Sequence, residues 1–386
     1  MHGIENVTPQ SILDLNKELK PRTILLLAEG GIGDILWATI AVKALKEKYP
    51  HARINVNTTA KYISLWINNP YVSGYSSMPR HVVTHAVYAH EEVIDFSGSV
   101  ASNPEAKKRH AVDLFLERAG IEEEKKSEQK IPFLRITKKE KLTARDTLGK
   151  LGIDYIKDKI IGVHLESSAP SRSWPYVRSQ ELTEKLCAEG YKVLFFGTNK
   201  DFEYITGFQC TCGENFEFKT KSDISRIEFV CAKCQQVVSA PLNKRPSGAF
   251  SLVDRSELRQ TFALISQLNL FIGPDSGLLQ VAVSQHIPSV GLYGPFDARL
   301  RTAYYDKHRD IQGYCGTGPC NEHKGYCKKG YPSMCMLNIP VKLVYQTADK
   351  LLEKYPIQRR EDWRQYDVDS AKIKRKGNNK NPASSI

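Results

Sequence analysis

Carboxylate, guanidinium and hydroxyl groups occur together with glycines in three loops of the sequence, each of which follows an apolar run. The first loop, Glu29–Asp34 (EGGIGD), lies just ahead of an apolar helix pattern. Glycines let the backbone approach a ligand closely, and a helix N-terminus offers unpaired N–H groups to an anion. The pattern predicts an anion-binding turn or, with equal weight, a helix that Asp34 simply caps.

Two later loops repeat this combination. Ser167–Pro175 (SSAPSRSWP) carries hydroxyls and one cation, Arg172. Gly273–Gly277 (GPDSG) places Asp275 and Ser276 ahead of another helix pattern. Alone, the first of these loops is by default a surface loop with a solvated arginine, and the second can be an ordinary helix cap by Asp275 or Ser276. Since ligands of open parallel sheets bind where strands end, the three loops together predict a site for a phosphate- or ribose-bearing ligand.

Two well-known phosphate-binding motifs do not match the first loop. The dinucleotide fingerprint G-x-G-x-x-G would need a third glycine after Gly31 and Gly33, where the sequence has Leu36. A P-loop would need a Gly-Lys-Ser or Gly-Lys-Thr ending, which does not follow. The loop therefore indicates ligand binding without naming the ligand.

A first group of cysteines has the spacing of a metal site. Cys210-x-Cys212 is followed, after a gap of residues 213–230, by Cys231-x-x-Cys234. This arrangement is close to a zinc ribbon, although the first pair has one intervening residue instead of two. Four thiolates close a tetrahedral site, so we expect structural rather than catalytic zinc, with free thiols as the weaker alternative.

The remaining cysteines are less specific. A second group has no knuckle spacing and lies near His323, so zinc, disulfides and free buried thiols all stay open; it comprises Cys315, Cys320, Cys327 and Cys335. Cys187 stands alone on an amphipathic helix pattern and is most simply a small buried hydrophobe.

The elements that would position these loops alternate between strand and helix patterns. Thr23–Ala28 and His51–Thr58 flank a helix pattern, which gives a βαβ unit and a parallel sheet. A second α/β half starts at Lys159, with strand patterns KIIGVHL, YKVLFFG, LNLFIG and IPSVGLYG. We therefore expect two Rossmann-like domains, residues 1–150 and 151–352, a zinc-ribbon insert at 208–245, and a C-terminal extension, 353–386, with a basic tail.

Composition limits the class of protein. The 386 residues are 41% hydrophobic and 25% charged, which is ordinary for a globular chain. Lys and Arg number 55 against 43 Asp and Glu, so the net charge is +12 and a polyanionic partner is indicated. No uninterrupted apolar run reaches the roughly 18 residues of a membrane-spanning helix. The polar N-terminus lacks a signal-peptide core, so we expect a cytoplasmic protein.

The sequence resembles glycosyltransferase family 9 in four segments, which are RTILLLAEGGIGDILWATIAVKALKEKYPHARINV, VHLESSAPSRSWP, GYKVLFFGTNKD and LISQLNLFIGPDSGLLQVAVSQHIPSVGLYGP. The family includes the bacterial ADP-heptose:lipopolysaccharide heptosyltransferases. The resemblance runs from Arg22 to Leu352 apart from the cysteine-bearing insert, and its most specific pieces are the Gly-Asp turn and the Asp-Ser-Gly helix start. It implies a GT-B fold, in which two Rossmann-like domains face each other across a cleft, and inverting transfer of a sugar from a nucleotide diphosphate.

Matched by position, the resemblance implies a role for individual residues. Asp34 would be the general base on the acceptor hydroxyl, and Arg172 would neutralise the diphosphate leaving group. Gln280 stands where the family usually has histidine and can carry neither a proton nor a charge, so the donor is not assigned as ADP-heptose. The implied donor-binding residues are Gly31, Gly33, Ser167, Ser168, Gly197, Thr198, Asp275, Ser276, Gly277 and Gln280.

Three functions are consistent with these patterns. The first is a nucleotide-sugar glycosyltransferase that acts on a saccharide or glycolipid, and the base rate of the family favours it. The second is a glycosyltransferase that modifies nucleic acid at a hydroxylated base, which the basic charge and the zinc ribbon would suit. The third is a nucleic-acid-binding protein that kept the fold and lost catalysis. The only Asp-x-Asp triplet, Asp367–Asp369, lies near the C-terminus, so we expect catalysis without a metal.

Overall fold

The chain forms two compact units, Met1–Arg135 and Ile136–Ile386. The division falls after Arg135, and the predicted domain limit at residue 150 stays a prediction. The computed structural model describes residues 21–122, 127–164, 167, 169–197, 204–209, 212, 214–220, 226–231, 233–241, 247–252, 256–321, 327, 333–356 and 359. The basic tail from residue 371 therefore lies outside the described residues.

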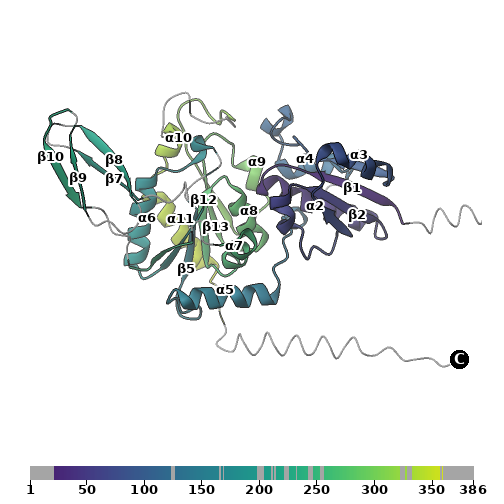
Figure 1. Cartoon of the computed structure of the whole chain (residues 1–386), viewed down its shortest axis with the longest axis horizontal. Coiled ribbons are helices and arrows are strands. Elements are labelled where there is room, and N and C mark those ends of the chain that lie inside the picture. The colour runs from purple at the N-terminus through teal and green to yellow at the C-terminus, as the bar shows by residue number, and fades with distance from the viewer. Residues whose placement is uncertain are drawn as a thin grey trace, which may run out of the picture. The chain divides into compact units, whose positions relative to one another are not determined.

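The first unit contains a parallel four-stranded sheet with the order β3-β2-β1-β4 (Figure 1). Its strands are β1 (Thr23–Ala28), β2 (Arg53–Thr58), β3 (Gly74–Ser76) and β4 (Glu92–Asp95). The first βαβ unit appears as the sequence predicts, with β1 paired to β2 across the helix between them. The order places β1 in the interior of the sheet, so the loop after β1 leaves from its centre.

Helices pack on this sheet through a common aromatic cluster. In α2 (Ile32–Lys48) ten residues are buried, and α2 contacts α4 (Ala111–Arg118). The rings of Trp37 and Phe96 lie 6.3 Å and 5.2 Å from that of Phe115. The remaining helical elements are α3 (Arg80–Tyr88) and the 3-10 turns η1 (Ala60–Leu65), η2 (Pro104–Lys107) and η3 (Ser127–Lys130).

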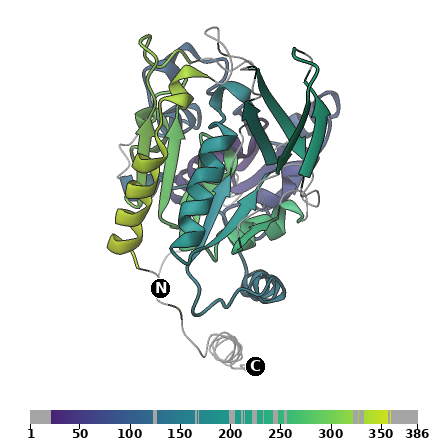
Figure 2. The same cartoon turned by 90° about the vertical axis from the view of Figure 1, so that its left-hand side faces the viewer.

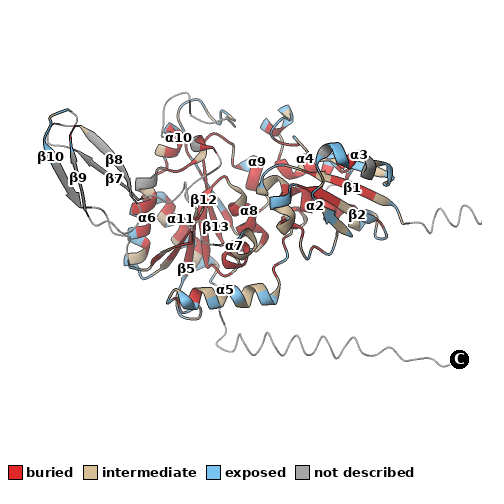
Figure 3. Ribbon diagram, viewed as in Figure 1, coloured by how far each residue is buried: buried red, intermediate tan, exposed pale blue. Residues whose placement is uncertain are grey.

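The second unit is built on a parallel six-stranded sheet with the order β11-β6-β5-β12-β13-β14. Its central strands are continuous apolar runs, as expected for strands that are covered on both faces. Figure 3 shows them buried. The strands are β5 (Ile160–His164), β6 (Lys192–Phe196), β11 (Ala249–Ser251), β12 (Leu270–Pro274), β13 (Ser289–Tyr293) and β14 (His308–Gln312).

Helices cover both faces of the six-stranded sheet. Figure 2 shows α6 (Tyr176–Ala188) and α11 (Val341–Lys354) side by side, and α7 (Leu258–Ile265) and α8 (Gly277–Ser284) lie on the other face in Figure 1. The shorter elements are the 3-10 turn η4 (Pro170–Arg172), α9 (Arg299–Thr302) and α10 (Met334–Leu337). In the part of the chain that the structure describes, no helix has both the length and the apolar character needed to span a bilayer.

The start of the second unit is fixed by α5 (Lys138–Lys150). The Thr137 hydroxyl caps this helix by accepting from the Glu140 N–H, and the Glu140 carboxylate accepts from the Thr137 N–H. Arg259 of α7 donates to the same carboxylate, which ties α5 to the body of the unit.

The cysteine-bearing insert forms two antiparallel hairpins between β6 and β11, separate from the six-stranded sheet. The first pairs β7 (Tyr204–Gln209) with β8 (Asn215–Thr220), and the second pairs β9 (Arg226–Val230) with β10 (Val237–Pro241). These strands span Tyr204 to Pro241, and the predicted insert limits of 208 and 245 stay a prediction.

Candidate functional site

In the first unit, the glycine turn between β1 and α2 holds the Asp34 carboxylate against its own backbone. The Gly31 N–H donates to Asp34 Oδ2 at 2.9 Å, and Asp34 is the third residue of α2, so the carboxylate caps the helix N-terminus. Gly30 has a φ of 131°, and a Cβ on it would lie 2.8 Å from Asp34 Oδ2. Glycine at position 30 is therefore what allows the carboxylate to approach the turn, and Gly33 is the second residue of α2.

Three neighbouring strands of the second unit bring the other predicted loops to one edge of the sheet. β5 lies between β6 and β12, and all three are parallel. Gly197 follows β6, Ser167 follows β5, and Asp275 follows β12. Carboxyl ends of adjacent parallel strands are where ligands of such sheets bind. Ser168 and Thr198 belong to the same loops but lie outside the described residues.

Arg172 contacts the Asp-Ser-Gly loop directly. Its Nη1 donates to the Asp275 carbonyl at 3.2 Å and lies 3.5 Å from Asp275 Oδ2. The Ser167 hydroxyl donates to the same carbonyl at 3.3 Å. The two side chains of the ion pair are 19% and 12% exposed, so Arg172 is not a solvated surface arginine. Trp174 anchors the same loop to the body of the unit, because its Nε1 donates to the Ile339 carbonyl at 3.2 Å.

A second arginine, which the sequence analysis missed, lies beside Arg172. The guanidiniums of Arg172 and Arg301 lie 5.6 Å and 5.3 Å from the centroid of the Phe296 ring. Arg301 is only 4% exposed. A cation over an aromatic face gains about 0.5–2 kcal/mol, so the ring helps to fix both charges. Nothing in the sequence distinguishes Arg301 from Arg299, whose side chain is 84% exposed.

The hydroxyl of Ser276 has two partners. It caps α8 by accepting from the Leu279 N–H at 3.4 Å, so Gly277 becomes the first residue of the helix. It also lies 3.0 Å from Nδ1 of His164, the last residue of β5. Burial lowers the pKa of the His164 imidazole to about 4, so the ring is neutral at physiological pH. His164 is the second site residue that the sequence analysis missed, since a strand-end histidine carries no motif.

Gln280, implied to bind the donor, is buried in the first turns of α8. It is 1% exposed, and its Oε1 accepts from the Tyr305 hydroxyl at 2.9 Å. Its Nε2 has no hydrogen-bond partner among the described residues. The amide is thus part of the packing beneath the Asp-Ser-Gly loop, and donor binding by Gln280 stays a prediction.

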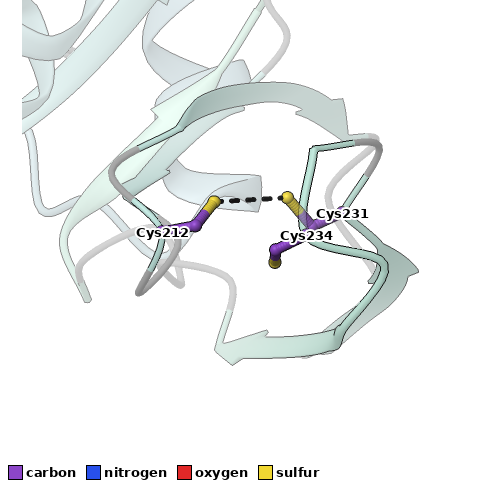
Figure 4. Close-up of side chains that lie close together, drawn as sticks. All are labelled: Cys212, Cys231 and Cys234. Atoms are coloured by element: carbon purple, nitrogen blue, oxygen red, sulfur yellow. Dashed lines mark hydrogen bonds between the residues drawn. The ribbon is translucent and has the colours of Figure 1, made fainter.

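The first cysteine group comes together in the insert. Figure 4 shows Cys212 facing Cys231, with Cys234 next to Cys231. The three sulfur atoms lie within 4.8 Å of one another. The Sγ atoms of Cys212 and Cys231 are 3.7 Å apart. These thiols come from the turns of the two different hairpins, so a bound ion would join them. Cys210, the predicted fourth ligand, lies outside the described residues.

The second cysteine group surrounds Cys335, which is buried in α10. Burial, and then the neighbouring sulfurs of Cys315, Cys327 and Cys320, raise the pKa of the Cys335 thiol to about 11. None of the four forms a disulfide in the structure. His323 lies outside the described residues. Cys187, on α6, is half-buried, and burial raises the pKa of its thiol to about 11, in keeping with an unreactive packing role.

The sequence matches one known family. The profile of glycosyltransferase family 9 (heptosyltransferase) covers residues 97–240 and 226–329. Lipopolysaccharide heptosyltransferase 2 of Salmonella typhimurium is 25% identical over 185 residues, which are 48% of this chain and 44% of that protein. The Escherichia coli protein of the same name gives 25% over 183 residues, or 47% and 43%. The chain thus spans less than half the length of the curated relatives it matches.

Solved structures share the fold over most of the chain. The glycosyltransferase family 9 protein of Veillonella parvula has a TM-score of 0.63 at 19% identity, with 86% of this chain and 98% of that one covered. The Escherichia coli ADP-heptose lps heptosyltransferase II has a TM-score of 0.59 at 18% identity, with 86% and 99% covered. This likeness confirms the predicted α/β fold of two Rossmann-like units with a small insertion.

Proposed function

Because the chain belongs to glycosyltransferase family 9, we propose that it is an inverting glycosyltransferase, which moves a sugar from a nucleotide-diphosphate donor to a hydroxyl group of a saccharide or glycolipid. The observation that carries this proposal is the convergence of Arg172, Asp275 and Ser276 at one edge of the second unit's sheet. A mostly buried guanidinium next to a helix N-terminus suits a diphosphate, whose negative charge grows as the sugar leaves.

The proposed reaction is a single displacement. Asp34 takes the proton of the acceptor hydroxyl, and the hydroxyl oxygen forms a bond to the anomeric carbon of the sugar. The bond between that carbon and the diphosphate oxygen breaks, and the diphosphate leaves with the electron pair. Attack from the side opposite the leaving group inverts the anomeric centre. Arg172 and the N–H groups that begin α8 stabilise the departing charge, so the mechanism assigns no metal to this step.

We propose a nucleoside-diphosphate sugar as the donor class and a polyanionic saccharide as the acceptor. The names of the relatives support both, since they specify ADP-heptose and lipopolysaccharide. The net charge of +12 would attract a phosphorylated glycolipid core. Gln280, in place of the histidine usual in the family, is the reason to leave the sugar and the base open.

Transfer assays with defined variants test the proposal. The purified protein is incubated with ADP-, UDP- and GDP-sugars and with glycolipid or nucleic-acid acceptors, and the masses of the products are measured by mass spectrometry. We expect a sugar mass increment on a glycolipid, lost with Asp34→Asn and strongly reduced with Arg172→Gln. Arg299→Gln removes an exposed arginine and is the matched control, with unchanged transfer. Transfer to nucleic acid would refute the proposed acceptor class, and no transfer from any donor would refute the enzyme.

The donor set of the insert supports a structural zinc ion. Cys212, Cys231 and Cys234 supply soft sulfur ligands at suitable spacing, and we propose that Cys210 completes the tetrahedron. Bound zinc would link the two hairpins. For the second cysteine group a metal site and a disulfide cluster both stay predictions, and the charges of Cys315, Cys320 and Cys327 act on the Cys335 thiol.

Elemental analysis distinguishes the two groups. We expect one zinc per chain that Cys231→Ser removes and Cys187→Ser, the matched control, retains. A second metal equivalent lost with Cys335→Ser but kept with Cys231→Ser would assign the second group. Stoichiometric zinc that survives Cys231→Ser would contradict the site in the insert.

A further inference from the structure

The histidine at the end of β5 occupies a place that the sheet leaves open for it. His164 pairs in register with Phe196 of β6, and the next strand on the other side carries Gly273. A Cβ on Gly273 would lie 3.2 Å from the His164 Cβ and 3.1 Å from the Phe271 ring. The missing side chain of Gly273 thus lets the imidazole lie close to β12, next to the loop that follows it.

The contact of His164 with Ser276 is shorter than the capping bond of the same hydroxyl. Nδ1 and Oγ are 3.0 Å apart, within the normal range for a hydrogen bond. The capping bond from the Leu279 N–H to Ser276 Oγ is 3.4 Å, at the long end of that range. The imidazole nitrogen is therefore the nearer of the two partners of the hydroxyl.

Acid–base catalysis is not the role that this environment suits. Burial lowers the pKa of His164 to about 4, far below the range in which a histidine exchanges protons near neutral pH. A neutral imidazole offers one donor and one acceptor nitrogen, which is enough to orient a hydroxyl without adding charge.

The end of β5 and the loop that follows it thus contact the loop after β12 at two neighbouring residues. Arg172 and Ser167 hold the Asp275 carbonyl, and His164 holds the next side chain, Ser276. We propose that His164 is a positioning residue for the donor site, which orients the Ser276 hydroxyl and the amino end of α8 toward the donor diphosphate. This inference rests on the proposed function, because it takes a nucleoside diphosphate as the ligand of that loop.

An isosteric pair of variants separates positioning from packing. Asparagine and leucine have nearly the same shape, but only asparagine keeps a polar atom at the position of Nδ1. One neutral hydrogen bond corresponds to about a three- to ten-fold change in affinity. We therefore expect His164→Leu to raise the dissociation constant for the tightest of ADP, UDP and GDP by about that factor, and His164→Asn to stay within about two-fold of the wild type.

Repeating the measurement in a Ser276→Ala background tests the route of the effect. If His164 acts through the Ser276 hydroxyl, His164→Leu has no further effect once that hydroxyl is gone. All variants are checked for cooperative thermal unfolding. If His164→Leu does not fold, His164→Gln replaces it, because its amide reaches the position of Nε2 and gives up that of Nδ1.

The outcomes are distinct. Equal affinity of folded His164→Leu and the wild type, or the same loss in both backgrounds, would overturn the positioning role while nucleotide binding and the proposed function stand. A wild-type protein that binds none of the three nucleotides and transfers no sugar would overturn the proposed function, and this inference with it.

Discussion

Replacing Glu140 by glutamine should destabilise the second unit in a way that depends on pH. Glu140 Oε1 and Oε2 accept from Nε and Nη2 of Arg259 at 2.5 Å and 3.0 Å, and Oε2 accepts from the Thr137 N–H at 2.7 Å. The carboxylate therefore links α5 to α7 at the start of the unit that holds Arg172 and Asp275. Glutamine keeps the shape but cannot satisfy Arg259 with charge.

The size of the effect follows from the pKa of the carboxyl. Burial raises the pKa of Glu140, but hydrogen bonds from Arg259 and Thr137 and the charge of Arg259 outweigh it and lower the pKa from 4.5 to about 2. At about 1.4 kcal/mol per pH unit this is about 3 kcal/mol. The side chains of Arg259 and Glu140 are 14% and 24% exposed, so solvent screening reduces the figure only in part. We expect a loss of about 2–3 kcal/mol at pH 7.

The sign of the pH dependence is fixed. Because the pKa is lower in the folded than in the unfolded chain, the stabilisation is complete above pH 4.5 and disappears as the pH falls toward 2. Urea denaturation from pH 7 down to pH 3 should show a gap between wild type and Glu140→Gln that narrows with acid. Glu181→Gln, an exposed glutamate on α6, is the control and should shift stability by less than about 0.5 kcal/mol. An equal stability at pH 7, or a gap that widens with acid, would refute the reasoning.

Other positions give narrower expectations. Gly30→Ala places a Cβ 2.8 Å from Asp34 Oδ2 and should reduce the rate of transfer at least tenfold in steady-state assays, roughly the effect of a misplaced catalytic group. Gly149→Ala adds a Cβ with nothing within 4 Å and should leave the rate unchanged. Asp34→Asn should lower kcat by about 10²-fold or more and leave the nucleotide dissociation constant unchanged, as measured by titration calorimetry. Gln280→Leu removes the amide oxygen that accepts from the Tyr305 hydroxyl and should lower the free energy of unfolding by about 1–3 kcal/mol in urea denaturation, and equal stability of the variant and the wild type would contradict this.

The central strands could be predicted because their burial makes them continuous apolar runs. The apolar patterns at residues 159–165 and 287–294 extend at most two residues beyond the ends of β5 and β13. The edges could not be predicted in the same way. β14 (HRDIQ) has a single aliphatic residue, Ile311, among four polar ones, and β11 has three residues, so neither carries an apolar run.

The candidate site was predictable only as far as loop chemistry is local. Glycine turns and capping residues such as Ser276 can be recognised from their spacing in the sequence. The environment of a side chain does not, because it depends on strand neighbours that are distant in sequence. His164 becomes a site residue through Gly273, and Arg301 through Phe296. Gln280 is the opposite case, because it occupies a motif position in the sequence but its side chain is buried in the structure.

The basic excess of the chain and the cation of the site act over different distances. Arg172 lies 3.5 Å from Asp275 Oδ2, so its charge is largely compensated within the loop and is felt by a ligand only at contact. At physiological salt, charges more than about 8 Å apart are screened from one another. In the proposed function, the net charge of +12 therefore bears on a large polyanionic acceptor and not on the donor. Under that proposal, donor selection and acceptor attraction depend on different residues, and a change of acceptor would leave the Arg172–Asp275 pair intact.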